Sequence, residues 1–363
     1  MASLKLMNPL TIRETTIPNR IVFPPIQTNY AAENGEATDR LIRFHKTIAQ
    51  NNVGLSIIGA TGISPFSKIG DHALCLYEKG QISSGEKLFK AIKEAGSIPA
   101  IQLNHGGRVM NPDLAGGKLV GPSAVPSPAT GNTPHELSAE EVQDIIDNFV
   151  QAAVNAKNAG AEMVEFHGAH CFLLNQFLSP LANQRKDQYG GSTENRARIV
   201  KEILRKAREK VGDKFIIGLR MSVEECVDGG LTVDESSKMV KMFVDESLDI
   251  IHVSAGGLDL EPQILTEVWS WKKLVNLAGD IKKQVDIPVI AVGGILSLNQ
   301  AESVIEEGLA DMVAMGRSLV ADPELVTKTL NGKLDEIDEC TYCLQCFAPS
   351  EDPGMTCSVN ENL

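Results

Sequence analysis

The chain has no apolar run of the roughly 18–20 residues that a membrane-spanning helix needs. Its N-terminal segment also lacks the hydrophobic stretch of a secretory signal. The chain has fewer basic than acidic residues, since 34 Lys and Arg and 47 Asp and Glu give a net charge of −13. These shortages argue against a membrane or a nucleic acid as partner. We expect an acidic, soluble, cytoplasmic enzyme.

A disulfide framework is missing too. Cys75, Cys171 and Cys226 are scattered, and the other four of the seven cysteines crowd into the last 24 residues. Those four are Cys340, Cys343, Cys346 and Cys357, with the spacing C-x2-C-x2-C-x10-C. Such spacing suits metal or cluster ligation in a reducing compartment. By spacing alone, a [4Fe–4S] cluster and a zinc ion serve equally well.

Short apolar runs alternate with longer amphipathic stretches along the first 330 residues. Each run reads as a strand that is covered on both faces. The runs are 20–25, 53–61, 98–103, 161–168, 215–222, 248–257, 287–294 and 311–317. Eight strand–helix units predict a (β/α)8 barrel. A doubly wound open sheet is the alternative, but no GxGxxG turn follows the first strand.

The sequence predicts where one helix begins and ends. In the segment 138–160, Ser138 is a candidate N-cap with Glu141 three residues later, and Gly160 is a candidate stop. The Gly- and Pro-rich segment 104–137 is too long for a simple connection. Because it follows the third strand, we expect it to overhang the mouth of the barrel.

Polar residues and glycines leave the strands at their C-terminal ends, where barrel enzymes build active sites. Gly293 and Gly294 end the seventh strand, and Gly316 and Arg317 end the eighth, which predicts a phosphate cradle. His167 and His170 follow the fourth strand and are suited to hold an oxygen. Gln102 and Arg220 end the third and fifth strands. An amide and a guanidinium there could hold a flat ring that carries carbonyls, although an internal ion pair is the commoner role for either alone.

These motifs together resemble one known family, the FMN-dependent old yellow enzymes. The similarity is greatest to the branch with an iron–sulfur cluster, which includes 2,4-dienoyl-CoA reductases, 2-enoate reductases and trimethylamine dehydrogenase. The stretches that carry the resemblance are NRIVFPP (19–25), IQLNHGGR (101–108), HGAHCFLLNQFLSP (167–180), YGGSTENRARI (189–199), VGGI (292–295), MGRSLVADP (315–323) and the cysteine tail.

The resemblance implies an FMN site and its residues. The ring of FMN would contact Pro25, Ile26, Gln27 and Ala60. Its pyrimidine edge would contact Gln102 and Arg220. Its phosphate would contact Gly293, Gly294, Gly316 and Arg317. His167 and His170 would bind the oxygen of an unsaturated carbonyl substrate. The cysteine tail would hold a [4Fe–4S] cluster, with zinc as the alternative. We therefore expect an FMN barrel at 1–335 and a tail with four cysteine ligands at 336–363.

The sequence departs from the family pattern at the expected proton donor. A Gly-Tyr pair usually follows the second histidine-type position, and here it is Cys171-Phe172. Phenylalanine has no proton to give, so the proton would come from Tyr30, Cys171 or water. Gln27 replaces the residue that often tunes the flavin, and without a cysteine nearby we expect dissociable FMN.

The favoured activity is that of an ene reductase, which delivers hydride to an activated alkene while the cluster relays electrons. The alternatives are an amine or demethylating dehydrogenase, with Trp269 and Trp271 as cage candidates, and a non-catalytic electron-transfer subunit. Electrons would come from NAD(P)H or from a separate FAD-containing reductase or carrier protein, since many cluster-bearing relatives continue into a second half. The chain is then either truncated or receives its electrons from a separate protein. The sequence does not decide whether the protein is a homo-oligomer. The loops 104–137 and 258–271 are expected to shape the substrate pocket.

Overall fold

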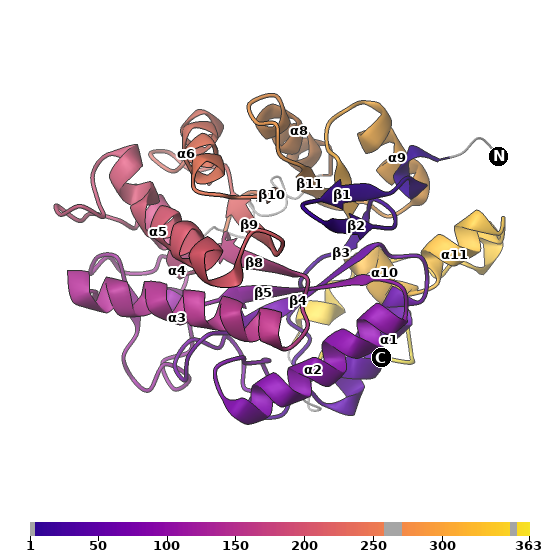
Figure 1. Ribbon diagram of the computed structural model, residues 1–363, viewed down its shortest axis with the longest axis horizontal. Coiled ribbons are helices and arrows are strands. Elements are labelled where there is room, and N and C mark those ends of the chain that lie inside the picture. Colours follow the sequence, from indigo (N-terminus) through magenta and orange to yellow (C-terminus); the bar gives the residue numbers. More distant parts are fainter. Residues whose placement is uncertain (1–3, 258–270, 349–353) are drawn as a thin grey trace.

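Eight parallel strands close into a barrel in the order in which they occur in the chain (Figure 1). The computed structural model describes residues 4–257, 271–348 and 354–363. The barrel strands are β3 (Ile21–Phe23), β4 (Leu55–Gly62), β5 (Ile98–Asn104), β8 (Met163–Gly168), β9 (Ile216–Ser222), β10 (Ile250–Ser254), β11 (Val289–Val292) and β12 (Met312–Ala314). Pairing of β12 with β3 closes the ring. The predicted (β/α)8 barrel is confirmed, and the open sheet is excluded.

The first and last barrel strands are shorter than predicted. β3 ends before Pro24, which has no N–H to donate to a strand ladder. β12 ends before Gly316, where the chain turns into α10 (Arg317–Ala321). The residues expected to bind ligand at these strand ends therefore lie in loops just beyond them.

Seven helices cover the outside of the barrel in the described part of the chain (Figure 1). They are α1 (Asp39–Ala49), α2 (Lys79–Glu94), α3 (Ala139–Asn158), α5 (Thr193–Val211), α6 (Val233–Asp245), α8 (Trp271–Lys282) and α9 (Leu298–Glu306). Short helices α4 (Leu173–Leu178), α10 and α11 (Leu325–Leu330) follow β8 and β12. No described helix combines the length and apolar character needed to cross a bilayer.

The ends of α3 are set by local sequence, as predicted. Ser138 Oγ accepts from the Glu141 backbone N–H at 3.1 Å, and the Glu141 carboxylate accepts from the Ser138 N–H at 2.8 Å. This reciprocal capping box satisfies two backbone donors at the helix start. Gly160 follows the C-cap with a φ of +97°, a conformation that glycine adopts without steric cost.

The N-terminal end of the barrel is plugged by an antiparallel hairpin of β1 (Leu10–Ile12) and β2 (Thr15–Ile17). Ile12 and Ile17 pack into the apolar cluster that fills this half of the barrel interior. Apolar filling makes the barrel a packed core and not a pore. The opposite end, where the strands terminate, is left for polar side chains.

The long segment 104–137 contains a 3₁₀ turn (Gly107–Val109) and a two-stranded parallel pair, β6 (Val120–Gly121) with β7 (His135–Glu136). It is tied to the loop region that follows β8. Arg185 donates to the Pro122 carbonyl at 2.9 Å, and Gln176 of α4 donates to the Gly106 carbonyl at 3.4 Å. The segment therefore lies at the C-terminal end of the barrel, beside β5 and β8.

Candidate active site

The interior of the barrel changes from apolar to polar toward the C-terminal ends of β5, β8, β9 and β10. Register places Gln102 beside Glu165, His167 beside Arg220, and His252 beside Arg220. Ser254 ends β10 in the same region. Four neighbouring strands thus bring an amide, a carboxylate, a guanidinium, imidazoles and a hydroxyl to the edge where barrel enzymes react.

A buried carboxylate lies under this edge. Glu165 has no exposed surface, accepts from Gln102 Nε2 at 2.7 Å, and lies 2.9 Å from His252 Nδ1 through its other oxygen. Sequence reasoning did not identify Glu165 or His252 as site residues. The available signal was a charged or polar residue inside the otherwise apolar runs AEMVEF and DIIHVS.

His167 and His170 come together, as predicted from their spacing, but they bond to one another. His167 Nε2 lies 3.0 Å from His170 Nδ1, and His170 Nε2 lies 2.8 Å from Ser254 Oγ. His170 reaches this position with a φ of +61°, which is uncommon outside glycine. The other nitrogen of His167, Nδ1, is buried and has no partner among the described residues.

Both imidazoles are kept neutral by their surroundings. Burial lowers the pKa of His167 well below 6.5, and the nearby His170, Arg220 and His252 lower it further. Burial, with Arg220 and His252, lowers the pKa of His170 in the same way. A neutral imidazole has one N–H donor and one acceptor nitrogen. The pair can therefore donate to an oxygen near neutral pH without carrying a positive charge.

Arg220 supplies the fixed positive charge of the site. Burial lowers the pKa of its guanidinium, and the Glu165 carboxylate opposes that shift. Its Nε is buried and unpartnered among the described residues. A guanidinium remains protonated in proteins, so the site keeps a positive charge beside His167.

The glycine ends of β11 and β12 adjoin the cysteine tail. Gly293 has a φ of +139°, and a Cβ there would fall 2.4 Å from Leu274 Cδ1. Arg317 lies with its guanidinium 4.8 Å from the ring centre of Tyr342, and the Tyr342 hydroxyl donates to the Gly294 carbonyl at 3.2 Å. The predicted phosphate cradle is thus capped on one side by a tail residue that sequence reasoning did not select.

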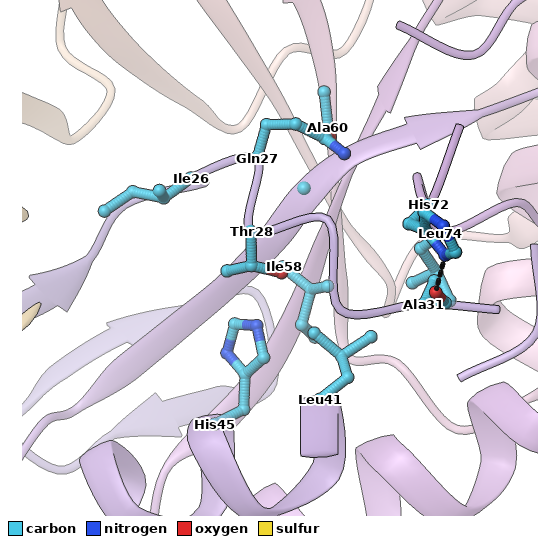
Figure 2. A pocket seen from close by; sticks show the side chains of 11 residues that line it. Ile26, Gln27, Thr28, Ala31, Leu41, His45, Ile58, Ala60, His72 and Leu74 are labelled. Carbon is cyan, nitrogen blue, oxygen red and sulfur yellow. Dashed lines mark hydrogen bonds between the residues drawn. The ribbon is translucent and has the colours of Figure 1, made fainter. Parts of the chain in front are cut away.

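The residues predicted to touch the ring from the first two strands surround a small cavity (Figure 2). Ile26, Gln27 and Ala60 line it together with His45 of α1. Its volume is about 10 Å³, room for one water, so this cavity is not the space that a ring would occupy. Gln27 Nε2 donates to Asn29 Oδ1 at 2.8 Å. Pro25 is half-buried in the same loop, and a Cβ added at Gly59 would fall 3.0 Å from the Pro25 Cβ.

Two of the three candidate proton sources are located by the structure. The Tyr30 hydroxyl donates to the Met355 carbonyl at 2.5 Å and is buried, so it serves to dock the tail. Cys171 lies beside the histidines and is buried against Gly257, where a Cβ would fall 2.1 Å from the Cys171 sulfur. Phe172 lies against the His167 ring, with centroids 4.7 Å apart.

The cysteine tail is attached to the barrel, but its thiols are not assembled into a metal-binding group. Within residues 4–257, 271–348 and 354–363, no cluster of three or more His, Cys, Asp or Glu side chains could hold a metal ion. Cys343 Sγ lies 3.0 Å from Ser358 Oγ, and this contact, followed by the Gln345 backbone, lowers the pKa of Cys343 to about 7. The geometry does not support the predicted cluster or zinc ion, so no chemistry is derived through either.

One of the two aromatic candidates for an amine site lies in the described part of the chain. Trp271 begins α8, packs against the core while partly buried, and lies with its ring centre 5.7 Å from Lys272 Nζ. Trp269 and the predicted pocket loop up to residue 270 lie outside the described residues. The contacts of Trp271 are therefore those of a residue that packs its helix against the core.

The polar edge fits an FMN group. Arg220 Nε and His167 Nδ1 are buried polar atoms without a partner among the described residues, and the register sets Arg220 beside His167. Arg317 lies against Tyr342, which also contacts Gly294, so a guanidinium and a glycine end are brought together. The first pair suits a flat polar ring, and the second suits a terminal anion.

Comparison with known proteins supports the same reading. Residues 5–336 match the family model described as NADH:flavin oxidoreductase / NADH oxidase family. An NADH oxidase of Thermoanaerobacter brockii is 40% identical over 359 residues, which cover 96% of this chain and 54% of that protein. An NADPH dehydrogenase of Clostridium acetobutylicum is 37% identical, over 92% of this chain and 97% of its own length.

Among solved structures, a 2-naphthoyl-CoA reductase in complex with 2-naphthoyl-CoA superposes with a TM-score of 0.88 at 27% identity. The match covers 94% of this chain and 54% of that one. The chain thus spans about half the length of the reductase and of the Thermoanaerobacter oxidase, and nearly all of the Clostridium dehydrogenase. With a polar barrel mouth and a family match over most of its length, the chain belongs to the NADH:flavin oxidoreductase / NADH oxidase family, the old yellow enzymes.

Proposed function

We propose that this chain is an FMN-dependent ene reductase, which takes electrons from NAD(P)H and reduces the C=C bond of an α,β-unsaturated carbonyl or enoyl thioester. The observation that carries the proposal is the polar edge of β5, β8 and β9, where Gln102 pairs with Glu165 and His167 pairs with Arg220. Family membership supports the flavin and the nicotinamide reductant. The similarity to an acyl-CoA reductase supports the thioester class.

The proposed FMN contacts divide by part of the cofactor. Gln102 and Arg220 would hold the pyrimidine edge, where the Arg220 guanidinium would favour negative charge. Pro25, Ile26, Gln27 and Ala60 would hold the ring, and Gly293, Gly294, Gly316 and Arg317 would hold the phosphate. Bound FMN supplies hydride transfer.

His167 and His170 orient and polarise the substrate. In the proposed complex, their N–H groups donate to the carbonyl oxygen as negative charge grows on it. Because His167 Nε2 and His170 Nδ1 are bonded to each other, the incoming oxygen has to replace that contact. Breaking one neutral hydrogen bond costs about 1 kcal/mol. This cost is smaller than the stabilisation from two new charge-assisted hydrogen bonds to the oxygen.

A proton must reach Cα as hydride reaches Cβ, so that the alkene gains two hydrogens. Phe172 offers none, and Tyr30 is committed to the Met355 carbonyl. We propose the Cys171 thiol or a water molecule as the donor. A Cys171→Ala variant that still saturates an enone at an unchanged rate assigns the proton to water, and one that loses this step but still binds substrate assigns it to Cys171.

The deciding experiment is anaerobic reoxidation. Protein reconstituted with FMN and reduced by NADPH or dithionite is mixed with 2-cyclohexenone and, separately, with crotonyl-CoA. We expect the flavin absorbance to return with formation of the saturated product. His167→Ala and His170→Ala are expected to keep FMN and its reduction by dithionite but to slow reoxidation by roughly 10²-fold or more.

Other outcomes contradict the proposal. If no enone or enoyl thioester reoxidises the flavin, the ene-reductase assignment is wrong. Flavin bleaching by methylated amines would instead indicate an amine dehydrogenase. Bound FMN that no small acceptor reoxidises would indicate an electron-transfer subunit.

We also propose, from spacing and resemblance alone, that Cys340, Cys343, Cys346 and Cys357 bind a [4Fe–4S] cluster, with zinc as the alternative. The tail at 336–363 would then form a unit distinct from the FMN barrel at 1–335. A separate reductase or carrier protein would be the alternative to NAD(P)H as the electron source. Anaerobically purified protein should contain about four iron and four sulfide per chain. A zinc content of one supports the alternative, and neither metal nor sulfide rejects both.

A further inference from the structure

A fully buried carboxylate with a buried histidine partner has no role in the proposed reaction. Glu165 is 0% exposed and His252 is 1% exposed, and they belong to β8 and β10 with β9 between them. In the register, Gly218 of β9 stands beside both Glu165 and Ile250, so β9 places no side-chain functional group between the two strands at this level. The pair therefore meets inside the barrel, directly below the site.

The carboxylate fixes the orientation of both groups that it touches. An ionised carboxylate only accepts hydrogen bonds, so the neighbour at each oxygen must donate. Gln102 presents Nε2 to it at 2.7 Å, which directs the amide oxygen of Gln102 away from Glu165. His252 presents Nδ1 at 2.9 Å, which sets the tautomer of its imidazole.

The same carboxylate is the counter-charge of the site. Arg220 is the register neighbour of both His167 and His252. Glu165 contacts His252, the register neighbour of Arg220, so the carboxylate lies near the guanidinium. Its charge opposes the burial that lowers the pKa of Arg220. In a region of low dielectric, one added or removed charge changes the local potential strongly.

We propose that Glu165 and His252 act as a positioning pair that orients Gln102 and balances the charge of Arg220, and that they thereby set the reduction potential of the bound flavin. The inference rests on the proposed FMN site. Neither residue is a catalytic residue, because both act through Gln102 and Arg220. Reduction adds negative charge to the ring, so a negative group below it disfavours the reduced form.

The test measures the midpoint potential and the dissociation constant of FMN in the holoenzyme. Glu165→Gln keeps the size of the side chain and removes its charge. We expect its potential to rise, with an increase of roughly tenfold or more in the equilibrium ratio of reduced to oxidised flavin, about 30 mV for a two-electron couple. His252→Leu should shift the potential in the opposite direction by less, because the carboxylate keeps its charge but loses the N–H group that partly offsets it.

Two variants separate positioning from general damage. His252→Asn offers an N–H close to the position of Nδ1 and should restore the wild-type potential. Glu202→Gln is the matched control, since Glu202 also accepts from a glutamine amide, Gln143 Nε2 at 2.8 Å, but on the helices outside the barrel. It should leave the potential unchanged.

The outcomes are distinct. An unchanged potential in Glu165→Gln with FMN bound overturns the positioning pair but leaves the FMN site standing. If Glu165→Gln does not fold, the two His252 variants decide, and equal potentials for Leu and Asn overturn the proposal. Wild-type protein that binds no FMN overturns the proposed function, and the positioning pair with it.

Discussion

His167 and His170 have one hydrogen bond between them, and both rings are neutral near physiological pH. Burial and the neighbouring cations keep the pKa of each ring well below 6.5. A group with a depressed pKa changes charge only in acid. In the proposed reaction, the two histidines would therefore act as hydrogen-bond donors to the substrate and not as charged general acids.

This predicts a flat pH profile for the step in which they act. Reoxidation of pre-reduced enzyme by an enone should show no histidine titration between about pH 6 and pH 8, since both rings are already neutral there. Stopped-flow flavin absorbance in this range provides the measurement. A break near pH 6.5 that disappears in His170→Asn would show that His170 is protonated in the working enzyme and contradict the prediction.

In its described residues, 336–348 and 354–363, the cysteine tail has only short 3₁₀ turns, yet it is tied to three parts of the barrel. Met355 N donates to the Thr28 carbonyl at 2.7 Å, Asn360 donates to the Val320 carbonyl at 2.8 Å, and Tyr342 stacks on Arg317. The C-terminus itself lies beside α1 (Figure 1), where Arg40 donates to the Leu363 carbonyl at 3.3 Å. The tail thus joins the loop after β3 to the glycine ends of β11 and β12.

The stacking predicts that tail residues contribute to FMN binding. Tyr342→Ala should raise the FMN dissociation constant by about two- to fivefold, because an exposed cation–π contact contributes about 0.5–1 kcal/mol. Tyr342→Phe keeps the ring and loses only the hydrogen bond to Gly294, so its effect should be smaller. Quenching of flavin fluorescence measures both constants.

Leu344→Ala is the control, since Leu344 is exposed on the same tail. Its FMN affinity should equal that of the wild type. Equal affinities for Tyr342→Ala and Leu344→Ala would show that Arg317 is positioned without the tail.

At the scale of the whole molecule, buried neutral histidines couple folding to pH. Burial lowers the pKa of His45 from 6.5 to about 3. Between these values the unfolded chain binds a proton that the folded chain does not, so stability is full above pH 6.5 and is lost as pH falls. The loss amounts to about 1.4 kcal/mol per pH unit for one such group.

His45→Gln should reduce that slope. Between about pH 5.5 and pH 4, the free energy of unfolding from urea titrations should fall less steeply with decreasing pH, by about 1.4 kcal/mol per pH unit. Ser56→Ala removes the hydroxyl 3.3 Å from His45 Nδ1 but no titrating group, so its slope should match the wild type. Identical slopes for His45→Gln and wild type would mean that His45 does not remain neutral in the fold.

The fold was predictable because its signals are local. Strands covered on both faces need continuous apolar runs, and helix starts need a capping residue at fixed spacing, so the eight strands and the Ser138 cap were evident in the residues themselves. The glycine ends and the His167–His170 spacing could likewise be placed at the barrel mouth. A parallel barrel brings all strand ends to one side, which made the location of the site follow from strand order.

Contacts between side chains of different strands are determined only when the barrel closes. Glu165 and His252 are separated by 87 residues, and Tyr30 and Met355 by 325, yet each pair forms a hydrogen bond. No local pattern encodes such contacts, because register and strand tilt determine which side chains meet. The sequence by itself determined the barrel, its reactive edge and the family. Tertiary structure alone decided that the two histidines bond to each other, that the Glu165 carboxylate meets Gln102 and His252, and that Tyr342 of the tail lies against Arg317. The physical reason is that long-range contacts follow from packing geometry and not from neighbours in the chain.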